Sequence, residues 1–131
     1  MKSILLIAAL FFLAPALASA QDGTVQDSLM KKPIILWGDL APGRHPAEDV
    51  RKQVQIKLPA GYKLKAATVY FTGANFTTVE KFSIASEDLS GLREAISRCV
   101  PGSVVILEKI LVTYNNGSQQ MFLRNSPFVC Y

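Results

Sequence analysis

The central part of this chain alternates polar and apolar residues with the two-residue period of β-strands. Residues 53–58 alternate strictly, so one side of that strand can be buried while the other faces water. Residues 64–72 are rich in β-branched and aromatic side chains, which fit a pleated surface. A third extended segment follows over residues 77–84, and a short apolar run at residues 34–37 predicts an earlier strand. The pattern therefore favours a β-rich domain.

The period changes to that of an amphipathic helix after the third extended segment. The apolar stripe of this helix consists of Leu89, Leu92, Ile96 and Cys99, which are three or four residues apart. A Pro-Gly pair at residues 101–102 ends the helix, and Ser86 or Asp88 can cap its start. Gly91 lowers helix propensity by about 1 kcal/mol relative to alanine. We therefore expect one short and frayed helix.

Residues 104–114 are apolar at nearly every position, which predicts a central strand covered on both faces. Strict alternation would place Ile106, Ile110 and Val112 on one face and Val105, Leu107 and Leu111 on the other. The Asn-Asn-Gly-Ser sequence at residues 115–118 is a strong hairpin signal, because Asn-Gly adopts the positive φ angles of tight turns. Residues 119–124 should pair back antiparallel, and residues 128–131 form a last strand.

These elements predict a mainly β (α+β) fold. We expect an antiparallel β-sandwich-like domain with about six or seven strands and one short amphipathic helix. Residues 39–46 hold prolines and glycines and should form an exposed loop. Residues 21–33 are mostly polar and aperiodic, which indicates a flexible leader. A single domain over residues 34–131 is expected, because about 100 residues support one hydrophobic core but not two.

The N-terminus has the three parts of a cleavable secretory signal peptide, in order. Lys2 is positive, residues 4–13 are apolar, and Ala-Ser-Ala at residues 18–20 is an A-x-A cleavage site. Cleavage is predicted between Ala20 and Gln21, and a cut two residues earlier also fits. The apolar run is about half the length that a membrane span needs. We therefore expect a periplasmic or secreted protein in which residues 1–20 are removed.

The charge balance is mildly basic, with 14 Lys and Arg residues against 10 Asp and Glu, a net charge of +4. Removal of Lys2 with the signal peptide leaves +3. The basic residues are scattered and form no stripe interleaved with aromatic side chains, so nucleic-acid binding is not expected. The most apolar later segment, residues 104–112, is interrupted by Glu108 and Lys109. We therefore expect no membrane span.

The two cysteines, Cys99 and Cys130, both lie beyond the signal peptide. An even pair in an oxidising compartment is most simply explained by one disulfide. Two buried free thiols are the alternative, because sequence spacing alone does not show that the residues approach each other.

The sequence contains few residues in arrangements that could support catalysis. The only histidine, His45, lies in a segment rich in Pro and Gly, and no G-x-S-x-G sequence frames a serine. The spacing of His45 from the cysteines does not suit a metal site. The chain has carboxylates at Asp39, Glu48, Asp49, Glu80 and Glu108. Nothing singles out two of them as an acid and base pair, and Glu108 is either partly buried or points outward. We predict no catalytic, cofactor-binding or metal-binding residues.

The second half of the chain shows a specific order of features: a short helix closed by Pro-Gly, the sequence Val-Val-Ile-Leu-Glu-Lys-Ile at residues 104–110, an Asn-Gly turn and an apolar terminal strand. This order resembles the C-terminal domain of the periplasmic gliding-motility protein M, the motor-shaft component of the type IX secretion apparatus of Bacteroidetes. The likeness covers residues 62–131 and is clearest over residues 89–117. It implies a β-rich periplasmic domain that contacts other proteins and performs no catalysis.

The resemblance does not carry over the motor role. Members of that family have an N-terminal transmembrane helix and a long helical stalk, and this chain has room for neither. We therefore expect a non-enzymatic exported protein-interaction module whose partners are proteins of the cell envelope, and the resemblance implies an accessory of the secretion or gliding machinery. The contact surface would be a sheet edge or the loop at residues 39–46. A small secreted enzyme or enzyme inhibitor with a disulfide-stapled fold stays open as the alternative.

Overall fold

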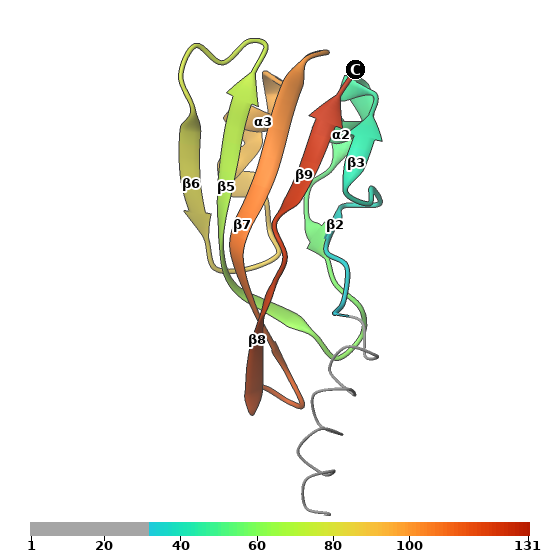
Figure 1. Ribbon diagram of the computed structural model, residues 1–131, viewed down its shortest axis with the longest axis vertical. Coiled ribbons are helices and arrows are strands. Elements are labelled where there is room, and N and C mark those ends of the chain that lie inside the picture. Colours follow the sequence, from blue (N-terminus) through green and yellow to red (C-terminus); the bar gives the residue numbers. More distant parts are fainter. Residues whose placement is uncertain (1–31) are drawn as a thin grey trace, which may run out of the picture. The chain divides into compact units, whose positions relative to one another are not determined.

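The computed structural model describes residues 32–131, and Pro33–Tyr131 form one compact unit (Figure 1). The predicted signal peptide, its cleavage site at Ala20 and Gln21, and the leader up to residue 31 lie outside the described residues. Within residues 32–131, no helix has the length and apolar character needed to cross a membrane.

The described residues contain eight strands and three short helical segments. In chain order they are β2 (Leu36–Trp37), β3 (Gly43–His45), α2 (Ala47–Lys52), β4 (Ile56–Lys57), β5 (Lys63–Gly73), β6 (Glu80–Ile84), the 3₁₀ turn η1 (Ser90–Leu92), α3 (Arg93–Ser97), β7 (Ser103–Tyr114), β8 (Gln119–Leu123) and β9 (Ser126–Cys130). The predicted mainly β fold is confirmed. The count exceeds the expected six or seven because residues 43–45, which were expected in a loop, form β3.

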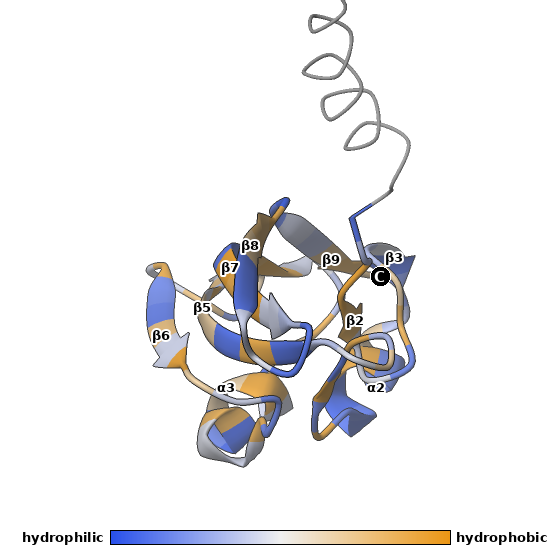
Figure 2. Cartoon of the chain, turned by 90° about the horizontal axis from the view of Figure 1, so that it is seen from below, coloured by the Kyte–Doolittle hydropathy of each residue, from blue (hydrophilic) through white to orange (hydrophobic). Residues whose placement is uncertain are grey.

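Six strands form one large sheet in the order β3, β9, β7, β5, β6, and β8 pairs with the second half of β7. All of its pairings are antiparallel except β3 with β9, which is parallel. The strands β2 and β4 pair separately as a two-stranded ribbon. Figure 2 shows β2, α2 and α3 on one side of the large sheet, so these elements form a second, mixed layer of a sandwich-like arrangement.

The hydrophobic core lies between the large sheet and this second layer. Trp37 of β2 is fully buried, with ring centroids 6.4 Å from Phe71 of β5 and 5.9 Å from Phe128 of β9. Its indole Nε1 donates a hydrogen bond to the carbonyl oxygen of Val50 in α2 at 3.1 Å, so the polar end of a buried aromatic ring is satisfied. Trp37 therefore ties the ribbon, the helix and the sheet together.

Strand β7 is covered on one face only, contrary to the prediction. Its burial alternates from Ser103 to Leu107, with every second residue buried and Ile106 half-exposed between them. At Lys109 the backbone has φ 51°, and the pairing with β5 shifts register there. This β-bulge inserts one residue, so the alternation changes phase. Ile110 is consequently buried on the same side as Leu107, although strict alternation had placed them on opposite faces.

The predicted amphipathic stripe is confirmed, although the helix is short. Leu89, Leu92, Ile96 and Cys99 are all at most 5% exposed. The segment begins as the 3₁₀ turn η1, which contains Gly91, and becomes α-helical only in α3. The predicted cap is wrong, because the N-cap residue of η1 is Leu89 and no side chain caps the turn. Asp88 lies one residue earlier and accepts a hydrogen bond from the backbone N–H of Ser90 at 3.0 Å. This hydrogen bond lowers the pKa of the Asp88 carboxyl.

The segment between residues 38 and 58 differs most from the prediction. Residues 43–45 were expected in a loop but form β3, which pairs parallel with β9. Residues 47–52 form α2, which the sequence did not predict. The strand expected at residues 53–58 is reduced to β4, because Val54 is 59% exposed and its carbonyl accepts a hydrogen bond from Leu89 instead of continuing a ladder.

Candidate functional site

The titratable side chains of the described residues are dispersed over the fold. Within residues 32–131 no group of three or more His, Cys, Asp and Glu side chains is placed to hold a metal ion. His45 lies in β3, and its Nε2 is 2.6 Å from the carbonyl oxygen of Ala41. Glu108, which was left open as buried or outward-pointing, lies half-exposed on the outer face of β7, opposite Thr68.

The structure does bring together the two residues that the sequence singled out, Cys99 and Cys130. Cys99 follows α3, Cys130 ends β9, and both side chains are at most 2% exposed. The two thiols are in hydrogen-bonding contact, which together with burial raises the pKa of the Cys99 thiol. The same contact lowers the pKa of the Cys130 thiol, helped by the positive charge of Arg51. The two thiols therefore titrate as a coupled pair.

The predicted disulfide is absent from the structure, in which both cysteines are free thiols. The structure has the alternative arrangement, two buried free thiols. A disulfide requires an oxidant that accepts two electrons and takes up the two thiol protons, and the structure describes the reduced pair. Closure under oxidising conditions stays a prediction.

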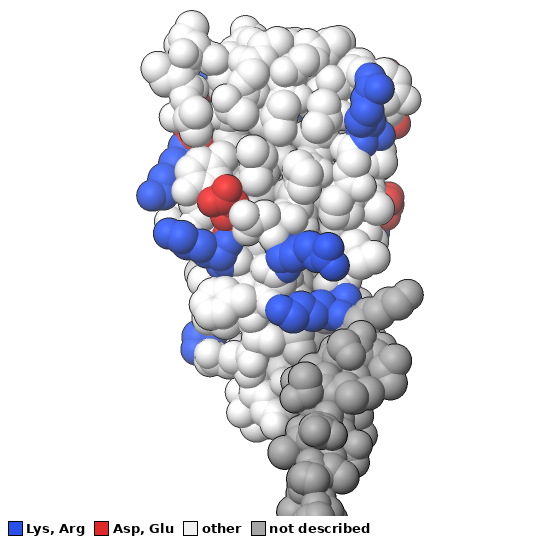
Figure 3. All heavy atoms as spheres, in the orientation of Figure 1, with Lys and Arg blue, Asp and Glu red and all other residues white. Residues whose placement is uncertain are grey.

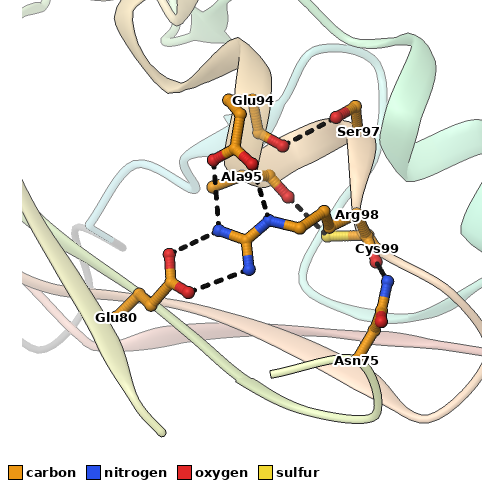
Figure 4. A network of polar contacts seen from close by, with 7 residues as sticks. All are labelled: Asn75, Glu80, Glu94, Ala95, Ser97, Arg98 and Cys99. Atoms are coloured by element: carbon orange, nitrogen blue, oxygen red, sulfur yellow. Dashed lines mark hydrogen bonds and ion pairs between the residues drawn. The ribbon is translucent and has the colours of Figure 1, made fainter. Parts of the chain in front are cut away.

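A polar network fixes the neighbouring helix to the sheet (Figure 4). The guanidinium of Arg98, just after α3, donates two hydrogen bonds to the carboxylate of Glu80 in β6, at 2.6 and 2.9 Å. It also bonds to Glu94, and it lies 4.8 Å above the ring centroid of Phe76. The hydrogen bonds from Arg98 hold the pKa of Glu80 below its usual value. The carbonyl oxygen of Arg98 accepts a hydrogen bond from the side-chain amide of Asn75 at 2.8 Å.

This network is a structural clamp and not a reactive site. Every charged group in it is paired with an opposite charge, and the bidentate Arg98–Glu80 geometry is the strong form of such a pair. Sequence reasoning missed it because the partners are 18 residues apart and belong to different elements.

The outer face of the large sheet is the remaining candidate surface. Cross-strand pairing places Tyr70 beside Ile106 and Ile106 beside Pro127 in one row, and Thr72, Val104 and Val129 in the next row. We call these six residues the outer patch. They are half-exposed, apart from the more exposed Pro127, and their neighbours along each strand point into the core.

Charged residues bound the outer patch instead of interrupting it. Lys81 lies opposite Tyr70 on the β6 side, Arg44 lies opposite Val129 on the β3 side, and Glu108 follows one row below. Figure 3 shows the upper part of this face almost without charged atoms, whereas lysines and arginines gather across its middle and lower parts. The arrangement is an apolar centre with a charged margin. The sequence predicted a contact surface at a sheet edge or at the loop of residues 39–46, and not on a sheet face.

A scan against protein-family models and a search of characterised proteins found no match to this chain. The likeness to the gliding-motility protein M domain therefore rests on the sequence features alone.

Proposed function

We propose that this chain is an exported, non-enzymatic protein-interaction module and that the outer patch is its contact surface. The observation that carries the proposal is the continuous, uncharged centre of the outer face, which spans three strands and is covered by no element among residues 32–131. An apolar centre with a charged rim is the usual composition of a protein interface. The rigid sheet beneath it presents this surface without an ordering cost on binding.

The partner is proposed to be a protein of the cell envelope. The resemblance to the gliding-motility protein M domain supports an accessory role in type IX secretion or gliding, in a periplasmic or secreted location. The half-exposed side chains of Ile106 and Val129 support contact through the sheet face. A flat partner surface would remove their remaining apolar area from water, which favours binding.

Site-specific photo-crosslinking in the native cell envelope tests the proposal. A photoreactive residue at position 106, in the middle of the outer patch, is expected to capture one partner protein reproducibly. The matched control places it at Val54, which is an exposed apolar residue outside the patch. Capture from position 54 but not from position 106 would refute the outer patch as the contact surface.

A surface variant gives a second measurement. Ile106→Lys adds a charge at the centre of the patch, where it is expected to weaken partner capture at least tenfold because the interface would bury an unpaired ammonium group. Val54→Lys is expected to leave capture unchanged. Unchanged capture by a folded Ile106→Lys protein would contradict the proposal.

A further inference from the structure

A groove of about 720 Å³ lies where β5 begins and β7 ends, at the lower end of the sheet in Figure 1. One wall is the turn that leads into β5, and the other is the tip of the β7–β8 hairpin. We call it the hairpin groove; the residues used below are Tyr62, Lys63, Tyr114, Asn115 and Asn116. Its volume falls within the range of small-molecule sites, about 300–1,000 Å³.

Backbone hydrogen bonds hold both walls in place. The N–H of Tyr62 donates to the carbonyl of Pro59 at 3.1 Å, and the N–H of Gly117 donates to that of Tyr114 at 3.1 Å. Lys63 pairs with Thr113 across β5 and β7. The hairpin groove is therefore built by the sheet ladder and two closed turns, so a ligand would not have to order it.

Two tyrosine rings lie together in the groove. The ring centroids of Tyr62 and Tyr114 are 5.7 Å apart with a tilt of 34°, and Tyr62 also packs against the hydrophobic core. Both residues are only half-exposed. Rigid aromatic faces of this kind offer contact area at a low cost in side-chain entropy.

Among the polar groups beside the rings, the side chains of Asn116 and Lys63 are available to a ligand, whereas that of Asn115 is engaged. The amide nitrogen of Asn115 donates to Gln119 at 2.6 Å, which fixes that side chain. Within residues 32–131 the side chains of Asn116 and Lys63 make no hydrogen bond or ion pair with another residue. The groove is lined by no acidic residue. It therefore offers amide donors and acceptors beside one uncompensated positive charge.

From this combination we infer that the hairpin groove binds a short carbohydrate chain that carries a carboxylate. The C–H face of a sugar ring packs on an aromatic ring, its hydroxyl groups both donate to and accept from amide side chains, and Lys63 attracts the carboxylate. A nucleotide is a poorer match, because one lysine and no arginine or helix N-terminus would have to hold its phosphates. This inference is independent of the proposed function, since the outer patch and the hairpin groove share no residue.

Titration of the isotope-labelled protein, as purified from the producing cell, tests the inference by backbone amide NMR. The probes are an oligogalacturonate, a neutral cello-oligosaccharide and an oligoglutamate peptide, each up to roughly millimolar concentration. The oligogalacturonate is expected to shift signals of the Tyr62 turn and the hairpin tip saturably and to bind more tightly than the neutral sugar. Oligoglutamate is expected to bind far more weakly, because it lacks the ring faces and hydroxyl groups.

Two variants report on the individual contacts. Asn116 has φ 56°, a conformation that glycine adopts freely, so Asn116→Gly removes the amide without straining the turn. We expect this variant to weaken the binding of both sugars about threefold to tenfold, which corresponds to the loss of one hydrogen bond. Lys63→Gln should weaken only the oligogalacturonate, by a similar factor. Lys81→Gln, on β6, is the control and should change neither.

Three results would overturn the inference. They are the absence of any saturable shift at the hairpin groove, oligoglutamate binding as tightly as oligogalacturonate, and equal effects of Lys63→Gln and Lys81→Gln. The second result would show a general anion site and not a carbohydrate site. Because Asn116→Gly and Lys63→Gln change opposite walls, loss of folding in one still leaves the other to decide.

Discussion

Oxidation of Cys99 and Cys130 is expected to stabilise the domain strongly. The two thiols are in contact in the reduced state, so the fold brings together the two groups that would form the bond. Electrons pass to a disulfide oxidant, such as oxidised glutathione, and the two thiol protons are released.

The magnitude follows from the length of chain that the bond encloses. Linking positions 99 and 130 closes a loop of about 30 residues, for which the loss of unfolded-state entropy is roughly 3–4 kcal/mol. A domain of this size shifts its melting temperature by roughly 4–8 °C for each kcal/mol. The oxidised protein should therefore melt more than about 10 °C above the reduced protein.

Thermal unfolding with and without a reductant, followed by circular dichroism, measures this difference. Mass spectrometry after alkylation in denaturant without reductant confirms the state, because unfolding exposes both buried cysteines and only free thiols take up label. A Cys99→Ala variant is the control, and its melting temperature should not respond to reductant. Labelling of both thiols in the exported protein, or an unchanged melting temperature after complete oxidation, would refute the reasoning.

Three further predictions concern stability. Arg98 lowers the pKa of Glu80 in the folded state, so the ionised carboxylate stabilises the fold above pH 4.5, and this stabilisation is lost as the pH falls through the folded-state pKa. The free energy of unfolding of Glu80→Gln, measured in urea, should therefore depend less on pH across that interval. An unchanged pH dependence would contradict this. Gly73→Ala should lower the free energy of unfolding by about 2 kcal/mol or more, because φ is 86° and a Cβ would lie 2.3 Å from the carbonyl oxygen of Gly102. Gly91 has open space around it and an ordinary φ, so Gly91→Ala should be neutral or stabilising. Ile110 is buried and Leu111 is half-exposed, so in the same assay Ile110→Ala should lower the free energy of unfolding by about 2–4 kcal/mol and Leu111→Ala by about 1 kcal/mol or less. Equal losses would show that the bulge does not determine which face of β7 is buried.

Local patterns predicted the longer elements well. The β-branched and aromatic run became β5, the Asn-Gly signal became the turn between β7 and β8, and the three-and-four spacing of Leu89, Leu92 and Ile96 became the buried stripe of η1 and α3. Each of these depends on neighbours a few residues away, which a sequence displays directly.

Features that depend on distant partners were not predicted. The bulge at Lys109 is set by pairing with β5, and nothing in the local sequence marks it, since lysine is an unusual residue at a positive φ. The parallel pairing of β3 requires β9, which follows about 80 residues later in the chain. Helix α2 is too short for a helical period to show, with only Ala47 and Val50 buried.

The candidate sites divide in the same way. Sequence reasoning named Cys99 and Cys130 because cysteines are few and their chemistry is specific. It did not name the outer patch or the hairpin groove, because both are assembled from residues that look ordinary in the sequence. Tyr62 and Tyr114, for example, are 52 positions apart and meet only through the β5–β7 ladder.

The position of β9 between β3 and β7 constrains when the domain can fold. Before residues 126–130 have been synthesised, the large sheet cannot be completed. Strands β3 and β7 do not pair with each other, and each of them pairs with β9. Pairing over such sequence separations is slow compared with local helix or hairpin formation. The complete sheet should therefore form only after synthesis has passed β9, whereas β5, β6, β7 and β8 can pair with one another before that point.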